Sequence, residues 1–436
     1  MASMFNLPSI RLPSLSSLFR PSPPSSTTTK LPPNRPITIE TSRDKLARTL
    51  KHLIKANHSN HSILYSHDRY HNHLPHALGA AYLFSPAHST SEGLHAIYEA
   101  EKVELEEWRD SPAEIARAGW RGHLGNTEYQ RAYVDFFEDE LARTGYDWKR
   151  LVVDYLLDEE GGPPLINGVL GGLAHPAIHL GYAFELGSRD VAMEGLGLIA
   201  CCWPAWHKYF DRPFEVPAGL STTSDVIGLI EQIREDTRFS DNPRSLGPSS
   251  SGDSATSREK AILEYWYRWE ITDPAKQIVD CFVAAIQLLV ATHQASHPAY
   301  DFFLCHLLTG LWAVRVLMSE LPASTPILLL RQWWMVTIRI YAAQRCPPVH
   351  ASYIDDYDVK GKDWKWVEHQ GLAGTQARDP HYVKALRVMR DCNGLFRSKD
   401  DFYLKAACKF GSEFTQWGGF GEGPRCEGTL IQDDML

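Results

Sequence analysis

The stretch LINGVLGGLAHPAIHLGYAFELG, residues 165–187, places two histidines four positions apart inside an apolar run. Residues at this spacing share one face of a helix and lie roughly 6 Å apart, so His175 and His179 could bind the same metal ion. Small and apolar neighbours would remove both imidazoles from water, and buried imidazoles need a partner. Pro176 fits the first turn of a helix, and the glycines before it permit a close backbone approach.

The alternative is a core helix with two hydrogen-bonded histidines. Taken alone, an HxxxH pattern favours that alternative, because the pattern is short and common.

The hydrophobic periodicity along the chain is helical almost throughout. We predict helices over 44–58, 71–84, 92–109, 126–144, 148–157, 190–202, 224–238, 260–269, 278–293, 300–321 and 324–343. Period-two segments bounded by hairpin turns are missing from the sequence. We therefore expect a mainly α fold, with one large multi-helical domain over residues 41–430 and a buried metal site between its helices. Residues 241–257, rich in Ser, Gly and Pro, are expected to form a flexible insertion loop.

The first 40 residues differ from the rest. Residues 1–39 contain no Asp or Glu and are rich in Ser, Thr and Pro, which is typical of a disordered tail or of an organelle targeting segment. The net charge of −9 gives no indication of a basic surface for a phosphate backbone, so we expect no nucleic-acid partner. The eight cysteines form no CxxC pair and indicate reduced thiols in an intracellular, cytoplasmic protein. No uninterrupted apolar run reaches the roughly 18 residues of a membrane span, and the nearest candidate is 278–291.

Further histidines fall in segments predicted to be buried. His73 and His76 lie three positions apart in HNHLPHALGAAYLF, where His71 also stands, and His306 lies in DFFLCHLLTG. Each alone is best explained as a core histidine with a hydrogen bond. Together with the central pair they form three separated histidine sites, and a metal centre becomes as good an explanation as a histidine-containing core.

A polar cluster near the C-terminus has two interpretations. In RDPHYVKALRVMR, residues 378–390, His381 and Lys384 would share a helix face one turn apart. The spacing alone favours a solvated cationic surface. A chemical role requires Lys384 to point inward, where burial would lower its pKa and free the neutral amine.

The sequence lacks the other common catalytic signatures. It has no GxGxxG after a strand, no P-loop, no GxSxG and no HExxH. We therefore expect that a nicotinamide cofactor, if one takes part, does not occupy a Rossmann domain.

Several of these segments resemble the questin oxidase-like family, a group of mainly fungal enzymes that modify aromatic polyketides. The resemblance rests on INGVLGGLAHPAIHLGYAFEL, HNHLPHALGAAYLF, DFFLCHLLTG, DPHYVKALR and WGGFGEG, in that order, and extends from about residue 45 to 425. It implies an oxidoreductase of secondary metabolism. This enzyme would be a mono- or dioxygenase that either cleaves an anthraquinone-type ring or inserts oxygen into it.

The resemblance also implies a site. Family members are associated with mononuclear non-haem Fe(II) held by four histidines and a carboxylated lysine, with O₂ as co-substrate and NADPH as a reductant in some cases. Carried over to this chain, the ligands and catalytic residues are His175, His179, His306 and Lys384, with His76 preferred over His73 as the fourth histidine. His381 is expected to be a supporting group beside the ligands or an alternative ligand, as is His73. A carbamate gives Lys384 the anionic oxygen that its ammonium lacks.

Two other functions stay open at this point. A histidine-ligated metal hydrolase on an α-helical scaffold would need a bound water and a carboxylate base, but no oxygen. A helical binding or scaffold protein would carry the same histidines only as core residues. The exact substrate, the bond cleaved and the oligomeric state do not follow from the sequence.

Overall fold

Each helix predicted from the periodicity is present, but the helices Ser352–Asp355, Trp364–Ala373 and Phe402–Glu413 were not predicted. The computed structural model describes residues 31–34, 37–85, 89–239, 252–292, 299–396 and 400–419. The α-helices in these ranges are α1 (Lys45–Asn60), α2 (Leu74–Phe84), α3 (Ser91–Glu101), α4 (Gln130–Arg143), α5 (Trp148–Leu157), α6 (His175–Leu186), α7 (Arg189–Cys201), α8 (Val226–Glu235), α9 (Gly252–Arg268), α10 (Pro274–Val290), α11 (Phe302–Glu320), α12 (Pro326–Ala343), α13 (Ser352–Asp355), α14 (Trp364–Ala373), α15 (Pro380–Phe396) and α16 (Phe402–Glu413).

Strands contribute little to the described part of the chain. β1 (Leu64–Tyr65) pairs antiparallel with β2 (Tyr70–His71), and β3 (Ala299–Asp301) pairs in parallel with β4 (Gln416–Gly418). The mainly α fold class is thereby confirmed.

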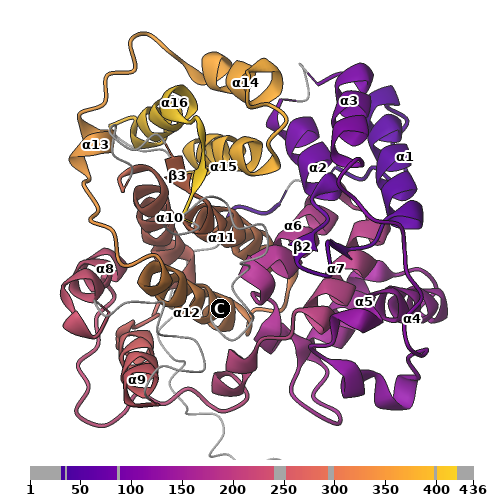
Figure 1. Cartoon of the computed structure of the whole chain (residues 1–436), viewed down its shortest axis with the longest axis horizontal. Helices are drawn as coiled ribbons and strands as arrows, with labels where there is room; N and C mark the ends of the chain where they lie inside the picture. The colour runs from indigo at the N-terminus through magenta and orange to yellow at the C-terminus, as the bar shows by residue number, and fades with distance from the viewer. Residues whose placement is uncertain are drawn as a thin grey trace, which may run out of the picture.

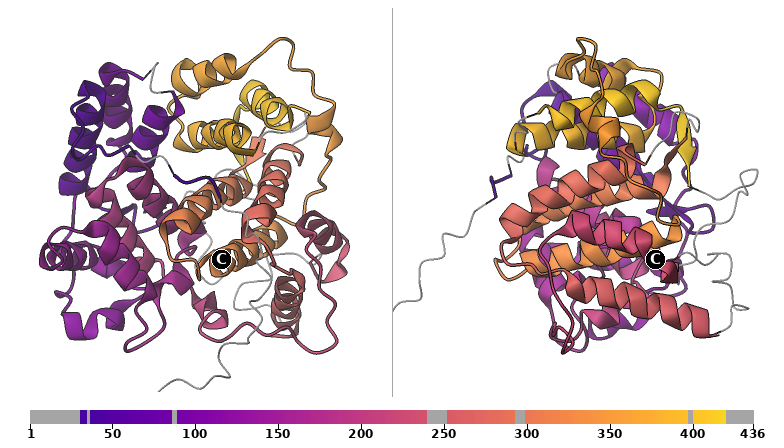
Figure 2. Two further views of the ribbon diagram at one scale, coloured as in Figure 1. Left: turned by 180° about the vertical axis from the view of Figure 1, so that it is seen from behind. Right: turned by 90° about the vertical axis from the view of Figure 1, so that its left-hand side faces the viewer.

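The chain forms two groups of helices that meet along a central seam. Helices α1–α7 lie on one side in Figure 1, and α8–α16 lie on the other. The views in Figure 2 show the same division from behind and from the side. At the seam, α6 packs against α7 and α11, while α15 packs against α2 and α11. The apolar sides of these helices form the core, and the segments that carry the predicted site residues meet within it.

The turn between α6 and α7 sets the geometry of the site. Gly187 ends α6 with φ of 62°, a left-handed conformation that glycine adopts without steric cost. Ser188 then begins α7, and its side chain accepts a hydrogen bond from the N–H of Val191. The chain therefore reverses direction within two residues, and α7 runs back beside α6. Glu194 on α7 is thereby brought level with His179 on α6.

Some predicted boundaries were wrong. The helix expected over 71–84 begins only at Leu74, with His73 at its N-cap and His71 in β2. The helix expected over 92–109 ends at Glu101. In both cases the polar residues beyond the boundary belong to strand, turn or irregular backbone, whose hydrogen bonds are not visible as a hydrophobic period. Residues 252–257, expected in the insertion loop, belong to α9, while 240–251 lie outside the described residues.

The end of the N-terminal segment is packed, contrary to the prediction of a tail up to residue 40. The backbone N–H groups of Ile37 and Ile39 donate to the carbonyls of Glu185 and Leu186, at 2.8 and 2.9 Å, and Ile39 is buried. The side-chain amide of Asn34 donates to the carbonyl of Val316 at 3.0 Å. Main-chain pairing of this kind requires no compositional signal, so the sequence did not indicate it. Residues 1–30 lie outside the described residues.

One helix in the described ranges, α11, is long and apolar enough to cross a membrane, but 89% of its apolar window is buried inside the protein. The sequence had pointed to 278–291 as the nearest candidate. Both segments are core helices here. The seven cysteines in the described ranges are buried thiols that form no disulfide, as expected, and Cys426 lies outside those ranges.

Candidate metal centre

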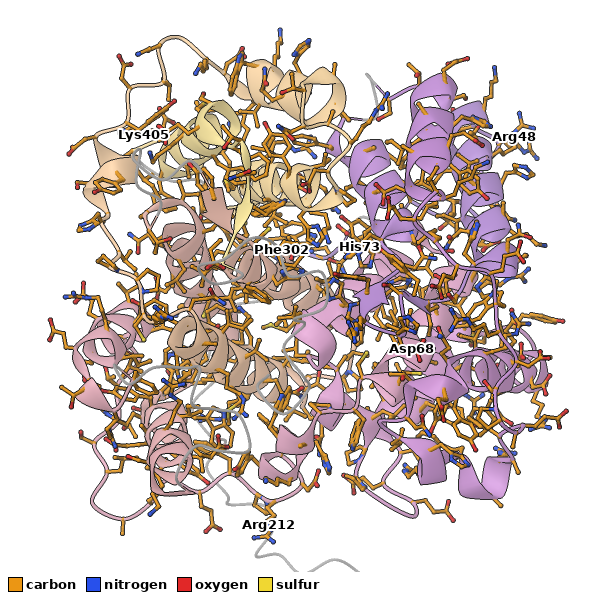
Figure 3. The ribbon with its side chains drawn as sticks, viewed as in Figure 1. Arg48, Asp68, His73, Arg212, Phe302 and Lys405 are labelled. Carbon is orange, nitrogen blue, oxygen red and sulfur yellow. The ribbon has the colours of Figure 1, made fainter. Side chains whose placement is uncertain are left out.

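The predicted histidines gather at the central seam. In Figure 3, His73 and Phe302 mark the place where the N-terminal helices meet the C-terminal ones. Ring centroids of His73 and His175 lie 4.9 Å apart, those of His73 and His381 4.5 Å, and those of His175 and His306 4.8 Å. The ring centroids of His76 and His179 are 4.6 Å apart. Segments as far apart in sequence as His73 and His381 therefore contribute to one cluster.

The start of α6 is held in an unusual backbone conformation. Gly172, Leu173 and Ala174 have φ of 52°, 55° and 63°, so two non-glycine residues in succession adopt the left-handed region directly before His175. Gly171 permits this turn, because a Cβ at that position would lie 2.2 Å from the carbonyl oxygen of Cys202. Strain of this kind persists only where the surroundings impose it. Here the turn directs the ring of His175 into the cluster.

Hydrogen bonds on the outer side of three rings fix which nitrogen faces inward. His175 and His306 donate from Nδ1 to the carbonyl oxygens of Gly172 and Phe302, both at 2.8 Å. His179 donates from Nε2 to the carboxylate of Glu194 at 2.8 Å. A neutral imidazole has one N–H, so the second nitrogen of each ring carries a lone pair. Carbonyl and carboxylate partners orient metal-binding histidines in the same way.

Ring nitrogens of neighbouring histidines lie at short distances from one another. Nε2 of His73 is 2.8 Å from Nε2 of His175, and Nε2 of His76 is 2.8 Å from Nδ1 of His179. The nitrogens of His73, His175 and His381 all lie within 4.8 Å of one another. The sequence preferred His76 to His73, and these distances are compatible with either choice. This group of three candidate ligands contains the alternative, His73.

Several polar atoms in the cluster have no partner within the described structure. These buried atoms are Nδ1 of His76, Nε2 of His306, Nε2 of His381 and Nζ of Lys384. A buried polar atom without a hydrogen bond costs about 1–3 kcal/mol, so four in one place is an expensive arrangement for a core that binds nothing. All four are nitrogens, and three are imidazole nitrogens, which are common ligands of iron and zinc. The donor set therefore fits a metal ion.

Lys384 points inward, so the surface interpretation of its helix was wrong. Only 1% of the residue is exposed, and it lines a small cavity together with Gly181 of α6 and Thr309 of α11. Burial lowers the pKa of its amine to about 8. The spacing correctly predicted that His381 and Lys384 share one face of a helix. It did not show that this face is turned toward the core.

Five of the clustered histidines are neutral at physiological pH. Burial, followed by repulsion from neighbouring basic groups, lowers the pKa of His73, His76, His175 and His381 well below the usual value. Burial likewise lowers the pKa of His306 to about 3. Neutral rings keep the lone pairs that a metal ion requires.

Three residues beside the cluster were missed as site residues. His71 stacks on His175 with ring centroids 3.9 Å apart, and Glu194 and His58 continue the hydrogen bonding outward from His179. Glu194 carries a signal in retrospect, because it is the lone charged residue in the apolar run VAMEGLGLIACC. His58 carries none, since it ends a polar helix.

Fold and cluster together define a mainly α-helical protein with a buried, histidine-lined centre suited to a metal ion. A family model described as questin oxidase-like matches residues 70–389. The chain belongs to this family, as the resemblance of its motifs predicted.

Curated relatives match over most of their length. The chain is 24% identical to oxidoreductase AflY of Aspergillus parasiticus, over 80% of this chain and 74% of the relative. It is 21% identical to Baeyer-Villiger monooxygenase AacuH of Aspergillus aculeatus, over 82% and 80%, and 22% identical to the questin oxidase of Aspergillus terreus, over 78% and 79%. Family and relatives identify the chain as an oxidoreductase, as expected.

Proposed function

We propose that the chain is a metal-dependent oxygenase that holds mononuclear non-haem Fe(II) and acts on an anthraquinone-type aromatic polyketide in secondary metabolism. The observation that carries this proposal is the set of unpartnered buried nitrogens at the seam, from His76, His306, His381 and Lys384. In a core without a ligand, these unpaired nitrogens would only lower the stability of the fold. A metal ion would satisfy several of them at once.

The residues that would hold iron are His175, His179 and His306, one of His73 and His76, and Lys384 as its carbamate. Lys384 supplies the anionic oxygen in this set, because a neutral amine that adds CO₂ becomes a carboxylate-like group. When bound, Fe(II) would supply the electrons that make O₂ reactive toward an organic ring.

The chain's own residues would prepare that chemistry. The carbonyl oxygens of Gly172 and Phe302 hold His175 and His306 with their inner nitrogens deprotonated. Glu194 does the same for His179. Burial of all three rings excludes bulk water, which would compete for the metal and react with oxidised species. His381, 4.9 Å from His306 between ring centroids, would support the ligands or replace one of them.

Two relatives support the reaction class by their names, a Baeyer-Villiger monooxygenase and a questin oxidase. Insertion of oxygen beside a carbonyl and oxidative cleavage of the ring are the two outcomes that we propose to distinguish. If oxygen is inserted beside a carbonyl, NADPH would act as a reductant for the metal or for the substrate. No Rossmann domain is expected to bind it.

The test combines metal analysis with oxygen consumption. Protein supplied with Fe(II) should contain about one iron per chain, and it should consume O₂ when an anthraquinone is added. His175→Gln should abolish both, while His52→Gln, at an exposed position on α1, should change neither. Circular dichroism of each variant separates loss of metal from loss of fold.

Other outcomes would favour the two remaining functions. Turnover under strict anaerobiosis would refute the oxygenase and support a metal hydrolase. Membership of the questin oxidase-like family does not favour a hydrolase. Folded protein that takes up no metal even with added iron would refute the metal centre and support a core role for the histidines.

A further inference from the structure

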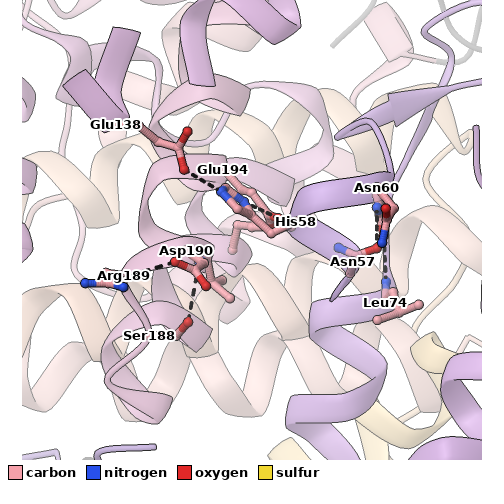
Figure 4. A network of polar contacts seen from close by, with 12 residues as sticks. Asn57, His58, Asn60, Leu74, Glu138, Ser188, Arg189, Asp190 and Glu194 are labelled. Carbon is pink, nitrogen blue, oxygen red and sulfur yellow. Dashed lines mark hydrogen bonds and ion pairs between the residues drawn. The ribbon is translucent and has the colours of Figure 1, made fainter. Parts of the chain in front are cut away.

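A continuous series of buried ionisable side chains leads away from the cluster. The carboxylate of Glu194 accepts a hydrogen bond from Nε2 of His179 at 2.8 Å through Oε2. Its other oxygen, Oε1, lies 2.9 Å from Nδ1 of His58, and Nε2 of His58 lies 2.8 Å from Oε1 of Glu138. Figure 4 shows the part of this series from Glu194 through His58 to Glu138.

The series crosses four helices, from α6 through α7 and α1 to α4. Glu194 is 1% exposed, whereas the side chain of Glu138 is 42% exposed, so the series ends in solvent. None of the three outer residues shares a sequence motif with His179. Their contact is a product of the α6–α7 reversal and of the packing of α1 and α4 on α7.

The hydrogen-bonding capacity of these groups fixes their protonation. A carboxylate only accepts hydrogen bonds, so a histidine placed between two carboxylates must donate from both nitrogens and carry a positive charge. That charge offsets the cost of burying the Glu194 carboxylate. Burial alone would lower the pKa of His58, but its hydrogen bonds to Glu138 and Glu194 outweigh burial and raise the pKa to about 10. The two oxygens of Glu194 are thereby divided between the rings, with Oε2 facing His179 and Oε1 facing His58.

We propose that Glu194 is a positioning residue for the histidine cluster, held in place by His58 and Glu138. By accepting the Nε2 proton of His179, it restricts this ring to one tautomer and directs Nδ1 inward. His58 occupies the second oxygen of Glu194 and prevents the carboxylate from rotating away. This inference rests on the proposed metal centre. It implies that Glu194, His58 and Glu138 raise the affinity for the metal although they do not contact it.

The test measures Co(II) binding to metal-free full-length protein, using the visible absorption of the bound ion as a spectroscopic signature. Glu194→Gln should weaken Co(II) binding by about 10–100-fold and change the spectrum, because an amide cannot accept from both histidines. Glu194→Asp keeps the charge but withdraws the carboxylate by one methylene, and should weaken binding about tenfold. This second variant keeps the test valid if Glu194→Gln does not fold.

A matched control is available on α4. Glu140 is also a buried carboxylate, 2% exposed, but it pairs with Arg143 and Arg117 away from the cluster. Glu140→Gln should lower the melting temperature and leave Co(II) affinity and spectrum unchanged. If Glu194 were only structural, its variants would behave like Glu140→Gln.

The possible failures are distinct. Folded Glu194 variants with wild-type Co(II) affinity and spectrum would overturn the positioning role and leave the metal centre standing. Wild-type protein that binds neither Co(II) nor Fe(II) would overturn the metal centre, and the role of Glu194 with it.

Discussion

The buried imidazolium at His58 makes stability depend on pH in a direction that the structure fixes. The pKa of this residue rises from an ordinary 6.5 to about 10 in the folded protein, since its bonds to Glu138 and Glu194 outweigh burial. A group whose pKa is raised by folding stabilises the fold fully below its unfolded pKa. That contribution is lost as the pH rises through the folded pKa. His58→Gln should therefore be costly at pH 6 and much less costly at pH 9.5.

The magnitude follows from the two pKa values. At roughly 1.4 kcal/mol for each pH unit, the difference sets an upper limit of about 5 kcal/mol. The side chain of Glu138 is 42% exposed, so solvent screens its share of the interaction. We expect His58→Gln to cost on the order of 2–3 kcal/mol more at pH 6 than at pH 9.5.

Urea unfolding of wild-type and variant protein at both pH values measures this difference, with chelator present so that metal binding does not contribute. His52→Gln on the same helix, at an exposed position, should change the free energy of unfolding by no more than about 0.5 kcal/mol at either pH. A cost of His58→Gln that is equal at pH 6 and pH 9.5 would refute the doubly hydrogen-bonded imidazolium.

Two further predictions concern the cluster. Lys384→Ala should lose metal and activity, with partial recovery from bicarbonate and a small carboxylic acid, and Lys384→Arg should not restore them, because a guanidinium cannot form a carbamate. Exposed Lys365→Arg is the control, and normal iron content in Lys384→Arg would remove Lys384 from the site. Gly171→Ala should destabilise the fold by about 1–3 kcal/mol, since its Cβ would lie 2.2 Å from the Cys202 carbonyl oxygen. Thermal unfolding measures this loss, with Gly122→Ala as the control, because a Cβ at Gly122 meets no atom within 4 Å. A Gly171→Ala variant as stable as Gly122→Ala would contradict the close approach at Gly171.

The sequence predicted the helices because most bury one continuous apolar face. α5 was placed with its observed bounds, and His175 was placed correctly at the start of a helix with Pro176 in its first turn. Turns and extended segments were less predictable. The region before α2 and the backbone pairing of Ile37 and Ile39 depend on main-chain hydrogen bonds, which have no periodic signature.

The candidate site was predictable where a polar residue interrupts an apolar helix. His306 and His179 were found in that way. Lys384 lies on a helix with polar residues on several sides, so its inward direction came from the family resemblance and not from the pattern. Glu194 and His58 depend on which helices pack together, and this information is absent from local spacing.

The seam has a consequence for the biosynthesis of the protein. The cluster draws on residues from His73 to Lys384, and α15 completes it by packing against α2 and α11. Domains emerge from the ribosome N-terminal part first, so α2, α6 and α11 are made before the segment that closes the cluster. A nascent chain therefore has no finished site to load. The metal ion that we propose for this cluster would therefore be acquired late in maturation, after the C-terminal helices dock.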